Sequence, residues 1–120
     1  MLSTRWTFPR KHKMPSIFTK IIAREIPADF VHEDELCVVI RDVHPKAPVH
    51  LLLIPKKEIP SLDDLNESDA PLLSHLFFVA QKVAEQEACK GSYKIQINVG
   101  KGGGQEIFHL HLHLLAWPNK

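Results

Sequence analysis

Three histidines near the C-terminus, His109, His111 and His113, alternate with apolar residues in the segment IFHLHLHLLAW. Successive side chains on a β-strand point to opposite faces of a sheet, so a strand here places all three imidazoles on one face. The other face receives the apolar side chains Phe108, Leu110, Leu112 and Leu114. Imidazole titrates near neutral pH and can act as a nucleophile, a general acid or base, or a metal ligand. The pattern predicts a strand with one buried face and one chemically active face.

Glycines are concentrated directly before this strand, in the segment GKGGGQE. Four of the five glycines of the chain lie there: Gly100, Gly102, Gly103 and Gly104. Glycine adopts positive φ and lets backbone amides approach an anion closely. Taken alone, such a segment is typical of a flexible hairpin turn. Beside three aligned histidines it favours a phosphate held next to a nucleophile or a general acid.

A metal site is the alternative interpretation of the histidines. Zinc ligands lie about 2.0–2.1 Å from the ion, so the donor nitrogens must converge. Alternate residues of a strand are about 6.6–6.8 Å apart, so two neighbours can share an ion but three on a flat strand cannot easily do so. Cys37 and Cys89 are far apart and are interpreted as buried, reduced thiols. Metal binding is therefore the second interpretation, and no metal is expected.

The other histidines have weaker contexts. His50 lies in APVHLLLIP, inside an expected strand that could lie beside the histidine strand. Its position alone favours a core histidine with satisfied hydrogen bonds, or a surface residue. We interpret the remaining four as surface residues: His12, His32, His44 and His75.

Hydrophobic periodicity predicts the elements that must position these residues. Ser16 is the expected N-cap of a short helix over IFTKIIA. The longest helix is expected to start at Ser68 or Asp69, with Pro71 in its first turn, and to stop at Gly91. Further expected elements are strands over residues 36–41, 49–55 and 92–100 and a helical turn from Ser61 to Leu65. Antiparallel-compatible strands with irregularly interspersed helices favour an α+β fold.

The composition is that of one globular domain. The chain has 120 residues, 44% hydrophobic and 24% charged, and lacks the roughly 18 consecutive apolar residues of a membrane span. Residues 1–14 carry four basic and no acidic side chains, which leaves 11 basic against 14 acidic residues elsewhere. We therefore expect a basic N-terminal extension over residues 1–15, a domain over 16–120 and a cytoplasmic location. The slightly acidic body argues against nucleic acid as a partner.

Longer segments around the histidines resemble one protein family. HLHLHLL fits the His-φ-His-φ-His-φ-φ signature of the histidine triad (HIT) superfamily, where φ is an apolar residue. Together with IFTKIIAREIPADFVHEDE and VIRDVHPKAPVHLLLIPKKEIPSL, it is similar to the Hint branch, the purine nucleoside phosphoramidases, over about residues 16–115. The resemblance implies an antiparallel sheet with one long and one short helix. It also implies a homodimer in which the sheet continues into the second copy.

The same resemblance implies an activity and its catalytic residues. His111 falls on the nucleophile, which attacks the α-phosphorus of a nucleoside phosphoramidate and forms a nucleotidyl-histidine. Water then releases the nucleoside monophosphate, AMP or GMP. The resemblance implies that His109 orients His111 through its backbone carbonyl, that His113 contacts the phosphate, and that His50 joins this network. No cofactor or metal is implied.

Nucleotide contacts carry over by the same resemblance. Asp42 matches the carboxylate that bonds ribose hydroxyls, and Asn98 matches a phosphate contact. The backbone around Gly104, Gln105 and Glu106 matches further phosphate contacts. Five residues match the apolar pocket that holds the base: Ile17, Phe18, Ile21, Val43 and Leu52.

Two departures affect the leaving group. Glu106 stands where some relatives have a serine implicated in protonating the leaving amine, and a carboxylate can do so only when protonated or through water. The C-terminal LLAWPNK is shorter than in some relatives, whose longer segment shapes the leaving-group pocket of the partner subunit.

Two alternative functions stay open. One is a dinucleoside polyphosphate hydrolase, and the other is a nucleotide-binding or scaffold module in which catalysis is incidental.

Overall fold

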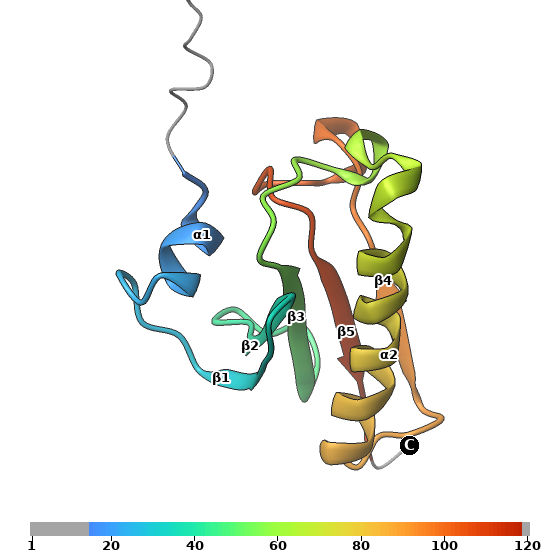
Figure 1. Ribbon diagram of the computed structural model, residues 1–120. Coiled ribbons are helices and arrows are strands. Elements are labelled where there is room, and N and C mark those ends of the chain that lie inside the picture. The colour runs from blue at the N-terminus through green and yellow to red at the C-terminus, as the bar shows by residue number, and fades with distance from the viewer. Residues whose placement is uncertain (1–14, 119–120) are drawn as a thin grey trace, which may run out of the picture.

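A single five-stranded sheet forms the centre of the protein in this computed structural model, which describes residues 15–118 (Figure 1). The strands are β1 (Phe30–Glu33), β2 (Cys37–Arg41), β3 (Val49–Pro55), β4 (Tyr93–Gln96) and β5 (Leu112–Ala116). Their order in the sheet is β1-β2-β3-β5-β4, and every pairing is antiparallel. The α+β prediction is confirmed. The expected N-terminal extension and His12 lie outside the described residues, apart from Pro15.

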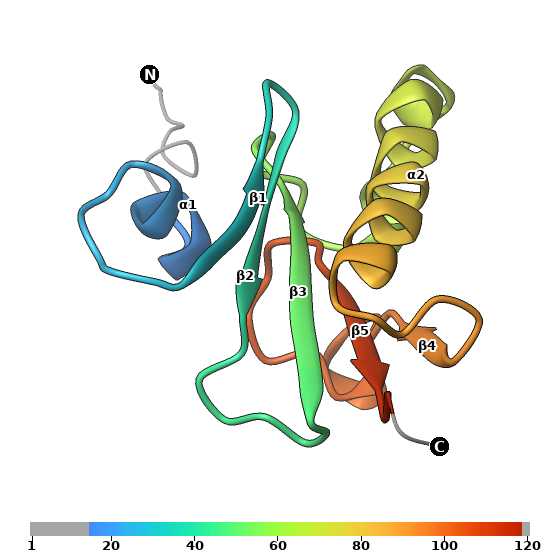
Figure 2. The ribbon, with the colours of Figure 1, turned by 90° about the horizontal axis from the view of Figure 1, so that it is seen from below.

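The two α-helices cover opposite faces of the sheet (Figure 2). The short helix α1 (Ile17–Ile22) packs its buried Phe18 and Ile21 against Val38, Ile40, Leu52 and Ile54. The long helix α2 (Ala70–Gln86) packs against the alternate residues of the same strands, including Val39, Leu51, Leu53, Leu112 and Leu114. All seven residues of β3 are buried because helices lie on both of its faces. The predicted pair of one long and one short helix is confirmed.

Local sequence signals explain where the helices begin. The Ser16 hydroxyl accepts a hydrogen bond from the Thr19 amide at 3.0 Å, as expected of an N-cap. Asp69 precedes α2, and Pro71 occupies its first turn. The helical turn predicted after Ser61 is a short 3₁₀ helix, Leu62–Asp64.

Three predicted boundaries differ from the structure, and one strand was not predicted. Helix α2 ends at Gln86, before Gly91, because Ala88 adopts a left-handed φ of 60°. β4 ends at Gln96, so only part of the predicted segment 92–100 pairs with β5. β1 was not predicted: it is four residues long and follows the extended stretch after Pro27. The histidine strand β5 begins only at Leu112, since the chain bends over residues 107–109.

Both cysteines are buried and free, which agrees with their interpretation as reduced thiols. Cys37 lies at the start of β2, and Cys89 follows the end of α2. Within residues 15–118, no helix combines the length and the apolar character that crossing a bilayer requires.

Candidate functional site

Three histidine side chains gather on the α1 side of the sheet. His111 and His113 have ring centroids 5.0 Å apart, and His113 lies 5.2 Å from His50. Phe18 of α1 packs edge-on against His111 at 4.9 Å. His50 and His113 are far apart in sequence but lie close together because β3 and β5 are neighbouring strands, in which Leu52 of β3 pairs with His113. The structure thus joins His50 to the histidine segment.

His109 is more deeply buried than the alternating pattern predicted. Its side chain is fully buried in the bend before β5, while Phe108 is half exposed. The imidazole Nε2 donates to the Pro55 carbonyl at 2.8 Å. Nδ1 of the neutral ring must then accept, and the Ser16 hydroxyl lies 2.6 Å away as the donor. His109 therefore lies on the α1 side, as His111 does, with its ring 5.7 Å from that of Phe18, but it is part of the core and is not accessible from that face.

His111 is held in one tautomer by the backbone. Its Nδ1 lies 2.7 Å from the carbonyl oxygen of His109, and a carbonyl can only accept a hydrogen bond. Nδ1 therefore carries the proton, and Nε2 of the neutral ring keeps its lone pair. Nε2 can therefore act as a nucleophile, because the His109 carbonyl that fixes the ring is bonded to Nδ1.

A second chain of hydrogen bonds fixes His50 and His113. The Lys46 amide donates to Nδ1 of His50 at 3.1 Å, so the neutral His50 ring carries its proton on Nε2. That Nε2 lies 3.0 Å from Nδ1 of His113 and donates to it. Nε2 of His113 then carries a proton that it can give to a ligand. Asp42 adds a carboxylate oxygen 3.4 Å from the His50 Nε2.

The electrostatic environment keeps these rings neutral. Burial lowers the pKa of His111 below its usual 6.5, although its bond to the His109 carbonyl acts in the opposite direction. Burial, together with the neighbouring His111 and His50, lowers the pKa of His113 to about 4. Burial also lowers the pKa of His50 and of His109. Neutral rings are what the two tautomer assignments require.

The residues expected to form the base pocket divide into two groups. Phe18, Ile21 and Leu52 are buried together between α1 and the sheet. Ile17 is 44% exposed and Val43 is 80% exposed, so these two side chains present apolar surface to solvent. Phe18, Ile21 and Leu52 form a fixed apolar wall, whereas Ile17 and Val43 are exposed side chains that a ligand can cover.

The glycine-rich loop is built by internal hydrogen bonds. Gly104 has a φ of 85°, which favours glycine, and a Cβ there would also crowd the side-chain amide nitrogen of Asn98 at 3.0 Å. The buried Gln105 side chain accepts from the Gly100 amide and donates to the carbonyls of Pro60 and Ile107. The amides of Gly104 and Gln105 also have acceptors within the loop. Gln105 therefore shapes the loop from inside, while Glu106 is exposed.

An open cavity of about 380 Å³ adjoins Ser16, the partner of His109. Its lining carries two carboxylates, Glu58 and Glu106, and apolar side chains that include Ile17 and Phe108. The cavity lies at the N-terminus of α1, beside the bend that carries the first triad histidine. It provides space for part of a ligand outside the apolar wall.

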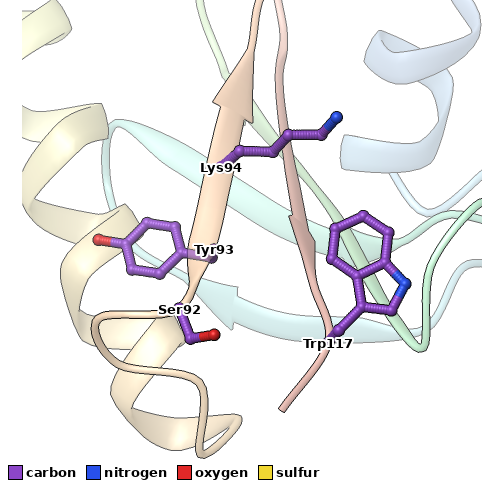
Figure 3. A pocket seen from close by; sticks show the side chains of 4 residues that line it. All are labelled: Ser92, Tyr93, Lys94 and Trp117. Atoms are coloured by element: carbon purple, nitrogen blue, oxygen red, sulfur yellow. The ribbon is translucent and has the colours of Figure 1, made fainter. Parts of the chain in front are cut away.

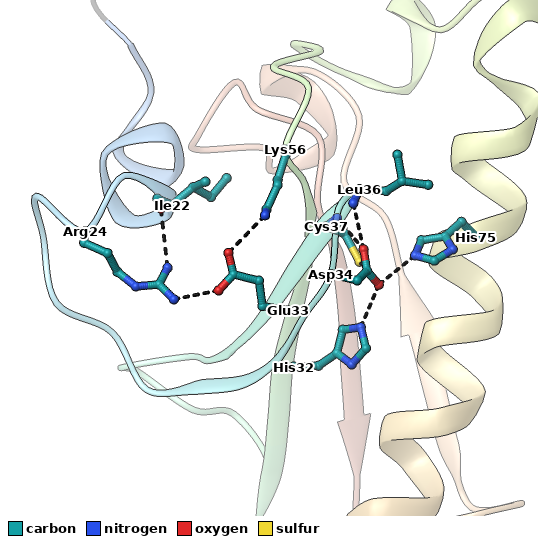
Figure 4. Close-up of polar contacts among 9 residues, drawn as sticks. All are labelled: Ile22, Arg24, His32, Glu33, Asp34, Leu36, Cys37, Lys56 and His75. Atoms are coloured by element: carbon teal, nitrogen blue, oxygen red, sulfur yellow. Dashed lines mark hydrogen bonds and ion pairs between the residues drawn. The ribbon is translucent and has the colours of Figure 1, made fainter.

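Two further histidines share a partly buried partner, Asp34, that the sequence did not reveal. Among residues 15–118, the potential metal-ligand groups are Asp42 with His50 and His113, and His32 with Asp34 and Cys37. His32 and His75 were expected on the surface, but both contact the Asp34 carboxylate, at 2.7 and 2.8 Å (Figure 4). Both side chains are partly exposed, so the expectation holds in part. It missed their contact with Asp34, which forms because the hairpin of β1 and β2 packs against α2. His44 is exposed, as expected.

Comparison with known proteins identifies the family. A family model described as "Scavenger mRNA decapping enzyme C-term binding" matches residues 15–120. The purine nucleoside phosphoramidase of Escherichia coli K12 is 44% identical over 102 residues, which cover 84% of this chain and 86% of that protein. The chain belongs to the histidine triad superfamily. This HIT domain is also 49% identical over 108 residues to an uncharacterised HIT-like protein of Synechococcus elongatus, covering 86% of this chain and 95% of that protein.

Solved HIT structures agree with the fold. The HIT family hydrolase of Legionella pneumophila superposes with a TM-score of 0.82 at 43% identity, covering 88% of this chain and all of that one. A histidine triad protein of Clostridium difficile gives 0.80 at 38% identity, covering 88% and 92% of the two chains. The resemblance to the Hint branch is confirmed, and the HIT domain described here is a HIT family hydrolase.

Proposed function

We propose that this HIT hydrolase cleaves the P–N bond of purine nucleoside 5′-phosphoramidates through a nucleotidyl-histidine. One observation carries the proposal: Nδ1 of His111 donates to the His109 carbonyl, which leaves Nε2 with a free lone pair in a partly buried, neutral ring. A phosphorus atom is an electrophile that such a nitrogen can attack without prior deprotonation. The similarity to the E. coli purine nucleoside phosphoramidase supports the choice of substrate class.

The proposed first step exchanges one bond for another at the α-phosphorus. The lone pair of His111 Nε2 forms a P–N bond, the bond to the leaving amine breaks, and the amine takes up a proton through water. Nε2–H of His113, set by the hydrogen bond from His50, donates to a phosphoryl oxygen and stabilises the developing negative charge. Water then attacks the nucleotidyl-histidine, which releases the nucleoside monophosphate and restores His111.

The proposed substrate lies across the α1 face of the site. The base packs on the apolar wall of Phe18, Ile21 and Leu52, with Ile17 and Val43 at its exposed margin. Asp42 bonds the ribose hydroxyls, and Asn98 and the backbone at Gly104 to Glu106 border the phosphate. The cavity that carries Glu106 takes the leaving amine, and this carboxylate assists its protonation through water.

Steady-state hydrolysis with three substrates tests the proposal. An adenosine 5′-phosphoramidate with a fluorogenic amine, its guanosine counterpart and a dinucleoside polyphosphate should be compared by kcat/KM. We expect the P–N substrates to be preferred, and mass spectrometry of acid-quenched protein to detect a nucleotidyl adduct. Preference for the P–O–P substrate would favour a dinucleoside polyphosphate hydrolase. Tight nucleotide binding without turnover of any of them would favour a binding module.

The rate should depend on pH with a midpoint below that of free imidazole. Only neutral His111 is nucleophilic, and burial lowers its pKa from 6.5, so kcat/KM should be maintained at pH 6.5 and fall only at lower pH. A kcat/KM profile from pH 4 to 8, with circular dichroism at each pH to exclude unfolding, measures this. A midpoint at or above pH 6.5 would contradict a buried, neutral nucleophile.

We also propose that the protein is a homodimer joined along β4. This strand is an edge of the sheet, so one side of its backbone is free to pair with a second copy. On the neighbouring helix α2, Phe77 and Phe78 are 41% and 67% exposed. Figure 3 shows Tyr93 of β4 directed toward α2, while Lys94 and Trp117 lie on the other side of the strand. Light scattering should give twice the chain mass, and Phe78→Glu should give monomers.

We propose a cytoplasmic location for the protein. Cys37 and Cys89 keep free thiols in the core, as a reducing compartment allows.

A further inference from the structure

A cluster of nitrogen, oxygen and sulfur donors lies apart from the histidine triad, where the β1–β2 hairpin meets helix α2 (Figure 4). One oxygen of Asp34, Oδ2, contacts Nε2 of His32 at 2.7 Å and Nε2 of His75 at 2.8 Å. Sγ of Cys37 lies 3.6 Å from the same oxygen. The donor atoms of His32, Asp34 and Cys37 all lie within 4.8 Å of one another.

The backbone holds the central carboxylate in place. Its other oxygen, Oδ1, accepts hydrogen bonds from the amides of Leu36 and Cys37 at 2.8 and 2.9 Å. Burial opposes ionisation, but bonds from His32, the Leu36 amide and His75 outweigh it and hold the pKa of Asp34 well below its usual range. The carboxylate is therefore a fixed anion at neutral pH, and Oδ2, which now contacts His32, His75 and Cys37, is the oxygen that would serve as a ligand.

We propose that His32, Asp34 and Cys37 bind a zinc-class divalent cation, with His75 as the nearest fourth ligand. Metal–ligand bonds of about 2.0–2.3 Å in a tetrahedral zinc site place neighbouring donor atoms roughly 3.3–3.6 Å apart. The observed separations from Asp34 Oδ2, between 2.7 and 3.6 Å, are close to these values. The donor atoms of His32 and Cys37 lie within 4.8 Å of each other, and His75 lies outside this group of three, so binding draws the side chains together around the cation. Mixed imidazole, carboxylate and thiolate donors suit zinc or cobalt rather than magnesium or calcium, which prefer oxygen.

Metal binding at this cluster changes the protonation of Cys37. In the metal-free protein, burial and the adjacent Asp34 charge raise the pKa of this thiol to about 12. Coordination requires the thiolate, so binding releases the thiol proton to solvent and strengthens as the pH rises. When the cation is bound, each histidine coordinates through Nε2 and carries its ring proton on Nδ1, so the cation takes the place of the two Nε2–H bonds to Asp34.

The cluster is separated from the triad by the sheet. Cys37 belongs to the core on the α2 side, and His75 lies on α2 itself. His111, His113 and His50 gather on the α1 side with Phe18. A cation here would tie the β1–β2 hairpin to α2 and stabilise the fold without contacting the nucleophile.

Cobalt titration of the full-length protein tests the site. Protein freed of metal with a chelator is titrated with Co²⁺, and we expect one equivalent to produce a thiolate-to-cobalt charge-transfer band that Zn²⁺ abolishes. Cys37→Ser should lose the band, while Cys89→Ser, the matched change at the other buried thiol, should keep it. His113→Ala should also keep it, which separates this cluster from Asp42, His50 and His113.

The remaining ligands need variants that keep the core intact, since Cys37 is fully buried. His32→Ala and His75→Ala, at partly exposed positions, should each weaken Co²⁺ binding at least tenfold. The melting temperature of wild type should rise with Zn²⁺, and that of folded His32→Ala should rise less. A band that survives Cys37→Ser, or no band at saturating Co²⁺ in the folded wild type, would overturn the proposal.

Discussion

Replacing His111 by alanine should reduce kcat for adenosine phosphoramidates by roughly 10⁴-fold or more, because removing a covalent nucleophile removes the pathway that uses it. The side chain lies between Phe18 and His113, at 4.9 and 5.0 Å. Neither neighbour can substitute, since Nδ1 of His113 accepts from His50 and its free nitrogen carries a proton. Single-turnover kinetics with excess enzyme measures the loss.

The control separates chemistry from binding and folding. His44→Ala makes the same change at an exposed histidine. The His44 backbone amide donates to the Asp42 carboxylate at 2.8 Å, and the variant retains this bond. It should turn over like wild type. AMP should bind His111→Ala within a few-fold of wild type, as measured by calorimetry. Turnover by His111→Ala within tenfold of wild type would mean that the nucleophile is elsewhere.

The strands and the histidine pair were predictable because both follow from periodicity. β2 and β3 are continuous β-branched and leucine-rich runs, typical of strands covered on both faces, and both were found within one residue. The two-residue repeat correctly placed His111 and His113 on one side of the chain. Periodicity needs no knowledge of the partner elements, which is why a single sequence reveals it.

The burial of His109 could not be read from the same repeat. The repeat assumes that the strand continues, but the chain bends over residues 107–109 and β5 begins at Leu112. The bend is fixed by contacts with distant segments: Leu110 donates to Ile59, and His109 bonds Pro55 and Ser16. Ser16 was identified as a helix cap, but its second contact lies 93 residues away in sequence.

The cluster around Asp34 was missed for a related reason. His32 and Asp34 are close in the sequence, but the segment HEDEL (residues 32–36) is typical of a charged turn exposed to solvent. The partner that makes the cluster distinctive, His75, lies 41 residues away on α2. His75 is one of several polar residues on an amphipathic helix, so its sequence context does not identify its partner.

His109→Ala should cost about 3 kcal/mol or more of unfolding free energy, the largest stability effect expected at this site. The change opens a cavity at a fully buried position, and comparable truncations cost about 2–5 kcal/mol. It also leaves the Pro55 carbonyl and the Ser16 hydroxyl without their partner, which adds to the cost. Urea unfolding followed by circular dichroism measures the difference.

His109→Gln is the matched variant, because glutamine carries an N–H donor at nearly the distance of Nε2 and fills most of the volume. It should retain the bond to Pro55 and recover part of the lost stability.

The effect of His109→Ala on activity should be smaller than its effect on stability suggests. The group of His109 that fixes His111 is its backbone carbonyl, which alanine also possesses. His109→Ala protein that remains folded should therefore lose far less activity than His111→Ala. An equally large loss in both variants would show that the His109 imidazole itself takes part in the reaction, and that its burial serves more than the core.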